Sequence, residues 1–163
     1  MPRLRVHMMS VSLDGYATGP DQGLDAPLGA GGEALHHWAV ATATFHRMQG
    51  RPGGTTGVDD DVLRRGEEGI GATTSTFVPD GIESALEQAF AAARGLDVRS
   101  GGGPATVQQY LRAGPVDELH VAVVPVLLGG GERLLDGLEG APPLQRAEVV
   151  ASPSAAHLRT VRR

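Results

Sequence analysis

The stretch VRSGGGPATVQQYLRAGPVDELHVAVVPVLLGGGERLLDGL, residues 98–138, decides the fold. A short strand, 97–100, runs into three glycines and then Pro104, which suits the first position of a helix. Apolar residues at helical spacing follow until Gly114, and a nearly continuous apolar strand, 118–128, comes next. Strand, helix and strand in this order predict a parallel pair in an α/β sheet.

The rest of the chain extends this pattern in both directions. Alternating and β-branched residues predict strands, whereas apolar residues at helical spacing predict helices. We expect strands at 3–13 and 74–79, and a pair of strands around Pro153 within 144–162. We expect helices over 33–47 and 80–95, and a short helix that begins at Asp59 and contains Val62 and Leu63. The order predicts one α/β domain, residues 1–163, with a mixed sheet that has an antiparallel edge.

Two helix ends carry specific signals. Asp80 and Glu83 have capping-box spacing, and Gly95 suits the end of the same helix. Asp59 is a candidate cap for the preceding helix. That helix is expected to end in a run of glycines: Gly66, Gly69 and Gly71.

Composition excludes several classes of function. The 163 residues contain no cysteine, so disulfides, thiolate metal sites and cysteine nucleophiles are excluded. The net charge of -5 argues against a nucleic-acid partner, and no apolar run approaches the roughly 20 residues of a membrane span.

No signal-peptide pattern opens the chain, so a cytoplasmic location is expected. All 14 basic residues are arginine, which excludes lysine chemistry. A chain this small and glycine-rich would gain from dimerisation.

Two stretches are candidate binding segments. The Gly101-Gly102-Gly103 turn leads into a helix N-terminus with Ala105 and Thr106, an arrangement that favours phosphate but is also compatible with a plain βα turn. Residues 10–15 end the first strand, and the carboxyl ends of parallel strands border the ligand crevice of open α/β sheets. Both stretches are therefore expected to border one pocket, although Asp14 also suits ordinary turn chemistry.

The remaining polar residues give weaker signals. None of the six histidines forms an i, i+4 pair, so no metal site is predicted. His36 and His37 are candidates to face a cleft from the first helix, with surface or core positions as the alternative. Asp59-Asp60-Asp61 suggests a cation site, but acidic residues also stabilise the first turn of a helix without any metal.

The run Ser12-Leu13-Asp14-Gly15 after a first strand resembles the SxDG signature of the dihydrofolate reductase-like superfamily. FVPDGIESALEQAFAAA, residues 77–93, and then 98–138 resemble the branch related to the C-terminal reductase domain of bacterial riboflavin biosynthesis. The resemblance covers roughly residues 4–70 and 74–140. It implies an α/β reductase fold, usually dimeric, that uses NADPH to reduce small heterocyclic or related substrates.

The resemblance also implies roles for individual residues. The nicotinamide cofactor would supply the hydride, while the protein supplies position and electrostatics. The cofactor pyrophosphate would be cradled by Gly101, Gly102, Gly103, Ala105 and Thr106, with Gly129 and Gly130 lining the nicotinamide or substrate end. Substrate would meet Ser12, Gly15, Leu35, His36 and Trp38. Candidate proton donors are Asp14, His36 and His37.

The sequence departs from the family in its centre. Gly71-Ala72 runs directly into Thr73, without the Gly-Arg motif, helix and second apolar strand that relatives have there. In the family this part contributes central strands and contacts to the cofactor's adenosine and 2′-phosphate. Three explanations fit: a deletion that lost the cofactor and kept the pocket, a reduced mode of cofactor binding, or a segment absent from a longer chain.

Two hypotheses about function follow. The first is an NADPH-dependent reductase of a small heterocyclic or secondary-metabolite substrate. The second is a cofactor-free relative that binds a hydrophobic small molecule for sequestration or self-resistance, or that catalyses a non-redox reaction such as a cyclisation.

Overall fold

The computed structural model describes residues 1–68 and 76–163. Within these residues one mixed sheet has the order β2-β1-β3-β5-β4. Its strands are β1 (Leu4–Ser12), β2 (Val98–Ser100), β3 (Val116–Val124), β4 (Leu144–Ala151) and β5 (Ala156–Arg162). β1 runs parallel to β2 and β3, whereas β5 is antiparallel to β3 and to β4. The predicted α/β fold with an antiparallel edge is confirmed.

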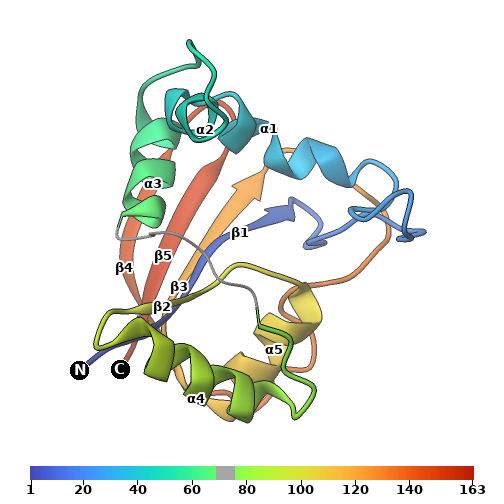
Figure 1. Cartoon of the computed structure of the whole chain (residues 1–163). Helices are drawn as coiled ribbons and strands as arrows, with labels where there is room; N and C mark the ends of the chain where they lie inside the picture. Colours follow the sequence, from blue (N-terminus) through green and yellow to red (C-terminus); the bar gives the residue numbers. More distant parts are fainter. Residues whose placement is uncertain (69–75) are drawn as a thin grey trace.

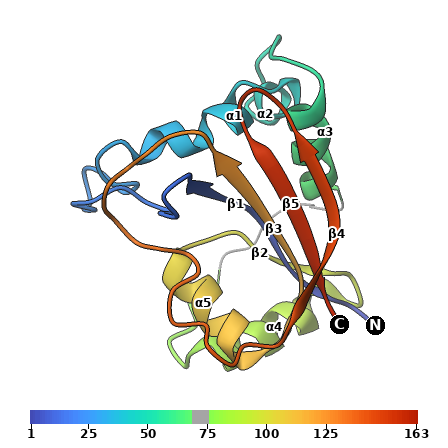
Figure 2. The same cartoon turned by 180° about the vertical axis from the view of Figure 1, so that it is seen from behind.

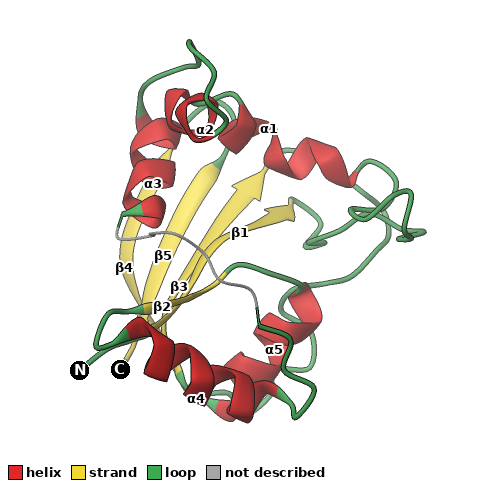
Figure 3. Cartoon of the chain, in the orientation of Figure 1, coloured by secondary structure: helices red, strands yellow, loops and turns green. Residues whose placement is uncertain are grey.

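The helices form two groups that the sheet separates (Figures 1 and 2). The first group is η1 (Gly32–His36), α1 (His37–Val40), α2 (Ala43–Met48) and α3 (Val58–Glu67); the second is α4 (Ile82–Ala93) and α5 (Pro104–Ala113). Figure 3 shows both groups against the strands. No helix in the described ranges is long and apolar enough to cross a membrane.

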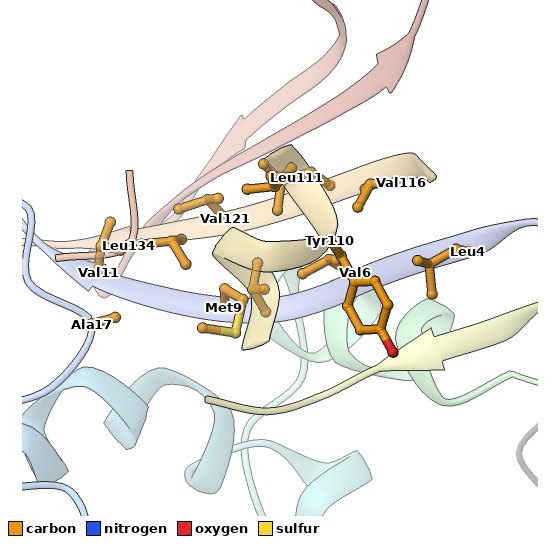
Figure 4. Packing of buried hydrophobic residues seen from close by; sticks show 12 residues of the cluster. Leu4, Val6, Met9, Val11, Ala17, Tyr110, Leu111, Val116, Val121 and Leu134 are labelled. Atoms are coloured by element: carbon orange, nitrogen blue, oxygen red, sulfur yellow. The ribbon is translucent and has the colours of Figure 1, made fainter. Parts of the chain in front are cut away.

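Each helix group covers its own apolar cluster. α5 buries Val107, Tyr110 and Leu111 against Val6 and Val121 of the sheet (Figure 4). On the other face, the first group of helices packs against alternate positions of β3. That second cluster contains Leu35, Trp38, Val62, Leu63, Ala122, Val124 and Ala155. The period of two along β3 therefore supplies side chains to both layers.

The single helix predicted over 33–47 is interrupted. Thr42 has an extended backbone, and its hydroxyl accepts a hydrogen bond from Phe45 N at 3.1 Å, so that it caps α2. A threonine whose oxygen can satisfy a helix amide competes with helix continuation. The local hydrogen bond outweighs the apolar periodicity, and the segment becomes η1, α1 and α2.

The predicted start of α4 is wrong in detail. Gly81 occupies the N-cap position and no side chain caps the helix there, so the Asp80 and Glu83 capping box does not form. At the other end Arg94, not Gly95, follows the last helical residue with a left-handed φ of 50°. Residues 76–79 are not a strand, and the rest of the predicted strand 74–79 lies outside the described residues.

The helix predicted with Asp59 as its cap begins two residues earlier. Gly57 is the N-cap of α3, and Asp59 lies in its first turn. Gly66 does not end the helix but lies inside it. Glycine fits there because a Cβ would come within 2.6 Å of His7 Nδ1. Gly69 and Gly71 lie outside the described residues.

β2 is the short edge of the sheet. It has three residues, and no strand among the described residues pairs with its outer side. α4, which packs near this edge, contains no fully buried residue.

Candidate functional site

The end of β1 closes into a tight turn. Ser12 Oγ accepts a hydrogen bond from Tyr16 N at 2.9 Å, and Ser12 O accepts one from Gly15 N at 2.9 Å. Gly15 has a φ of 90°, a conformation that favours glycine. The residues of the SxDG motif therefore have a structural role, because their hydrogen bonds form this turn.

Asp14 connects this turn to the loop after β3. Its Oδ1 accepts from Leu128 N at 3.1 Å and its Oδ2 accepts from Gly129 N at 2.8 Å. The Ser12 hydroxyl and these two amides lower the pKa of Asp14 to about 2. The carboxylate stays ionised near neutral pH and has both oxygens engaged, which makes it a loop anchor and a poor proton donor.

The loop that follows the turn lies directly on residues 129–133. Ala17 N donates to Glu132 O at 2.8 Å, and Glu132 N donates to the Thr18 hydroxyl at 3.1 Å. A Cβ at Gly131 would lie 1.9 Å from Thr18 O, so the two backbones meet where only glycine fits. The structure therefore brings the predicted Ser12–Gly15 and Gly129–Gly130 segments together.

A cavity of about 420 Å³ opens beside these loops, lined by residues 25–29, 31, 33, 34 and 37. His37 is exposed and lines the cavity, whereas His36 is half-buried and does not. Burial, followed by the neighbouring His37, lowers the pKa of His36. Of the two predicted histidines, only His37 is placed to meet a ligand in this cavity.

Leu35 and Trp38 do not form the predicted substrate wall. Their exposed fractions are 0% and 2%, and both belong to the apolar cluster beneath the first helix group. Trp38 Nε1 donates to Ser10 Oγ at 2.9 Å, which satisfies its one polar atom inside the core. The helical periodicity correctly indicated an apolar face, but that face packs against the sheet.

The glycine turn opens to solvent at the start of α5. Gly101, Gly102 and Gly103 are exposed, and Gly103 is the N-cap residue with a φ of 42° and no side chain to satisfy the first amides. A Cβ at Gly102 would meet nothing within 4 Å. Ala105 and Thr106, also exposed, follow Pro104 in the first turn. Free backbone amides at the N-terminus of a ten-residue helix can bind a phosphate group by donating hydrogen bonds to its oxygens.

α5 is linked to the Asp14 turn through Arg133, because Gln108 Nε2 donates to Arg133 O at 2.6 Å and the Arg133 guanidinium donates to Asp14 O at 2.9 Å. β2 ends where Ser100 pairs with Val6, and Ser12 is six residues farther along β1. At roughly 3.3 Å per residue Ser100 and Ser12 are on the order of 20 Å apart along the sheet, and the glycine turn and α5 follow Ser100. That the two stretches border one pocket stays a prediction.

A row of buried histidines was not anticipated from the sequence. His7, His120 and His157, from three adjacent strands, stack with ring centroids 5.0 and 5.3 Å apart. Trp38 meets His157 edge-on at 4.7 Å. We call these three residues the imidazole row. A polar residue recurring within the apolar strands was the available signal, but only strand register brings the three together.

Hydrogen bonds give part of this row a direction. Met8 N donates to His120 Nδ1 at 3.2 Å, so the neutral His120 ring carries its proton on Nε2. That nitrogen lies 3.3 Å from His157 Nδ1, which leaves His157 Nε2–H to donate to Asp59 Oδ1 at 2.8 Å. Burial, then His7 and His157, lowers the pKa of His120 to about 3. The row is accordingly neutral at His120 near pH 7.

The acidic run at the start of α3 is used for structure. Asp59 accepts from His157 and, through Oδ2, from the Ser152 hydroxyl at 2.9 Å. Asp60 accepts from Thr44 N, and Asp61 pairs with Arg64. In the part of the chain that the structure describes, no group of three or more histidine, aspartate or glutamate side chains is arranged to hold a metal ion.

Comparison with known proteins agrees with this architecture. Residues 80–158 match the family model described as RibD C-terminal domain. No curated protein matches the sequence.

Among solved structures, a Shewanella sp. PV-4 protein described as a riboflavin biosynthesis protein is 20% identical, with a TM-score of 0.57 over 100% of this chain and 99% of that one. A pyrimidine reductase-like protein from Corynebacterium diphtheriae is 16% identical, with a TM-score of 0.53 over 99% and 92%. The riboflavin biosynthesis reductase Rib7 of Saccharomyces cerevisiae is 12% identical, with a TM-score of 0.52 over 99% and 89%.

The likeness at this identity concerns the fold and spans the whole chain, including the half that the family model leaves unmatched. Residues 80–158 therefore resemble the RibD C-terminal domain, and the chain has an α/β fold similar to that of these three proteins.

Proposed function

We propose that the protein is an NADPH-dependent reductase of a small heterocyclic or secondary-metabolite substrate and acts in the cytoplasm. The observation that carries the proposal is the open glycine turn at the start of α5, on a fold shared with riboflavin-biosynthesis proteins. Its exposed amides fit a diphosphate, and nothing in the described structure covers Gly102.

The residues present fit one part of the cofactor. Gly101, Gly102 and Gly103 would hold the pyrophosphate with the amides of Ala105 and Thr106. When bound, the cofactor would supply the hydride.

The chain's own residues would organise the reacting end. Asp14 holds Leu128 and Gly129 and so sets the position of the 128–131 loop. The cavity beside residues 25–37 would take the substrate, with His37 as the exposed group able to exchange a proton there. Ser12 and Gly15 build the turn beneath this loop, and we propose no direct substrate contact for Leu35 or Trp38 because both are buried.

A charge reversal at the turn tests this proposal. Gly102→Asp places a carboxylate where the diphosphate would lie, with open space around it, and should abolish saturable NADPH binding measured by fluorescence or calorimetry. Gly23→Asp is the matched control, because its Cβ also meets nothing and its φ is not left-handed. Wild-type protein that binds no NADPH while folded would refute the proposal.

One observation favours a second candidate function. The sheet ends at β2, so the described structure offers no strand beyond the glycine turn to hold an adenosine. This candidate is a cofactor-free protein that binds a hydrophobic small molecule, or that catalyses a redox-neutral reaction such as a cyclisation. It would need only the cavity lined by residues 25–37. Binding of an apolar probe without NADPH binding would support this candidate.

We also propose a homodimer. α4 has no fully buried residue and β2 exposes a sheet edge, so a second copy would cover surface that this fold leaves open. Sedimentation equilibrium at micromolar concentration tests this, since a monomer mass would contradict it.

A further inference from the structure

The segment that follows the 128–131 loop is attached to one side of α5. Gln108 Nε2 donates to Arg133 O at 2.6 Å, and Arg112 Nε donates to Gly137 O at 2.6 Å. Gln108 and Arg112 are four residues apart, so they lie on the same face of the helix. We call residues 132–137 the linking segment, because it contacts both α5 and the turn after β1.

The side chain of Arg133 continues this connection to the Asp14 turn. Its guanidinium donates to Asp14 O at 2.9 Å and lies over the Tyr16 ring, with Cζ 4.3 Å from the ring centroid. The backbones of Tyr16 and Arg133 also form an antiparallel bridge. A planar guanidinium can stack on an aromatic ring and donate a hydrogen bond at the same time. The linking segment therefore holds the turn through a side chain as well as through its backbone.

Gly15 leaves room for this guanidinium. A Cβ at Gly15 would lie 2.9 Å from Arg133 Nη1, so a larger residue would displace the arginine side chain. The φ of 90° at Gly15 is a separate reason for glycine at this position. The glycine of the SxDG motif therefore has two structural roles, and one of them is to admit Arg133.

The backbone of the linking segment is held independently of the Arg133 side chain. Leu134 is 0% exposed and belongs to the apolar cluster that α5 covers. Glu132 is bonded through its backbone to Ala17 N and to the Thr18 hydroxyl. The Arg133 side chain is exposed and belongs to neither apolar cluster. Its truncation should therefore leave the fold intact and release the turn that it contacts.

We propose that Arg133 is a positioning residue that fixes the Asp14 turn, and with it the 128–131 loop, relative to α5. Asp14 accepts hydrogen bonds from the amides of Leu128 and Gly129, so the position of the turn determines the position of this loop. The ligand of this arrangement rests on the proposed function, because a dinucleotide held at the glycine turn and at the loop needs both at a fixed separation. Arg133 acts through the turn and is not assigned a contact with the reacting atoms.

Amide exchange tests the contact between Arg133 and the turn. Arg133→Met keeps a long apolar side chain over Tyr16 but cannot donate to Asp14 O. Exchange at the amides of Gly15 and Gly129 should accelerate about five-fold, as the loss of one hydrogen bond predicts.

A second arginine supplies the matched control for this exchange measurement. The Arg112 guanidinium also donates to backbone carbonyls of the linking segment, but to those of Asp136 and Gly137, outside the turn. Arg112→Met should therefore leave exchange at Gly15 unchanged. Equal acceleration in the two variants, or none in Arg133→Met, would overturn the proposal.

A double variant tests whether α5 acts on the turn through Arg133. Gln108→Leu removes the hydrogen bond from α5 to Arg133 O and should also accelerate exchange at Gly15. In the Arg133→Met background the same substitution should add nothing further, because the turn is already released. Gln109→Leu is the control, since Gln109 Nε2 donates to Ala105 O within α5. Additive acceleration in the double variant would show that Gln108 and Arg133 act independently, against the proposal.

Two phosphate ligands separate positioning from a general loss of structure. Inorganic pyrophosphate is small enough to bind at the glycine turn alone, whereas NADPH would reach the 128–131 loop as well. Calorimetry should show that Arg133→Met weakens NADPH binding about five-fold and leaves the affinity for pyrophosphate unchanged. Unchanged NADPH affinity, or equal weakening of both ligands, would contradict a positioning role.

Failure of the reductase proposal gives a different result from failure of this one. If folded wild-type protein binds no NADPH, the reductase proposal is wrong. The exchange rates at Gly15 in the Arg133, Arg112 and Gln108 variants then decide by themselves whether Arg133 positions the turn.

Discussion

The middle of β1 and the turn that follows it differ in where their polar partners come from. At the turn, Ser12 is buried and its partners lie within four residues along the chain. In the middle of the strand, the partners of His7 and Met8 come from β3, more than a hundred residues away. A local turn leaves a recognisable motif, whereas a buried network leaves only isolated polar letters in apolar strands.

Acidic pH should lower the free energy of unfolding mainly through the buried His120. The pKa of His120 is about 3 in the folded state against 6.5 when unfolded, so the unfolded chain binds the extra proton between these values. Stability is therefore complete above pH 6.5 and falls as the pH decreases toward 3, by on the order of 5 kcal/mol at most. Urea unfolding between pH 7.5 and 4 measures this loss.

A control separates histidine from carboxylates. The pKa of Glu118, lowered to about 2 by His7, Arg5 and Arg159, affects stability only below about pH 4.5. A His120→Leu variant should accordingly lose most of the pH dependence between 6.5 and 4.5. If the wild-type protein is equally stable at pH 7.5 and 5, the assignment of a neutral His120 is wrong.

Truncation of Leu35 should come next in size. This residue is 0% exposed, and Leu35→Ala should cost about 2–5 kcal/mol of unfolding free energy. Affinity of the folded variant for any ligand of the 25–37 cavity should change little, because the side chain faces the core. A variant of normal stability with lost ligand affinity would restore Leu35 to the substrate wall.

Removing the indole donor should have a smaller effect. Trp38→Phe leaves the buried Ser10 hydroxyl without its partner, at a cost of about 1–3 kcal/mol in thermal or urea unfolding. In the Ser10→Ala background Trp38→Phe should lower the free energy of unfolding by less, because no buried hydroxyl then loses its hydrogen-bond partner. Equal costs in both backgrounds would show that the hydrogen bond is unimportant.

Asp14→Asn should have the smallest effect on the free energy of unfolding of the whole protein. Its effect should be confined to the turn after β1 and the 128–131 loop that Asp14 contacts. An amide has one accepting oxygen, so it cannot bond both Leu128 N and Gly129 N. Amide exchange at these two residues should accelerate several-fold while exchange in β3 is unchanged. Asp25→Asn, an exposed change in the neighbouring loop, is the control. Unaltered exchange at residues 128 and 129 would contradict the anchor role.

Local chemistry explains what was predictable in the fold. Pro104 starts α5 and Gly114 ends it, and the strand predicted over 97–100 forms as β2. The strand predicted over 118–128 forms as β3 but ends at Val124, before Pro125. The helix over 33–47 was wrong because the cap at Thr42 depends on a backbone turn that periodicity does not report. The Asp80 capping box was wrong because Gly81 takes the cap position.

The candidate sites divide in the same way. The glycine turn, Asp14 and the 128–131 loop were predictable, since each is a short segment with its own turn chemistry. The sequence by itself determined the α/β order, the turns and the resemblance to a reductase family. Only the tertiary structure decided that Leu35 and Trp38 are core and that His7, His120 and His157 stack. The same holds for the chain of ion pairs that joins Arg5, Glu118, Arg159, Glu148 and Arg65. The physical reason is that strand register and long-range packing set these contacts, and neither is encoded in a short run of residues.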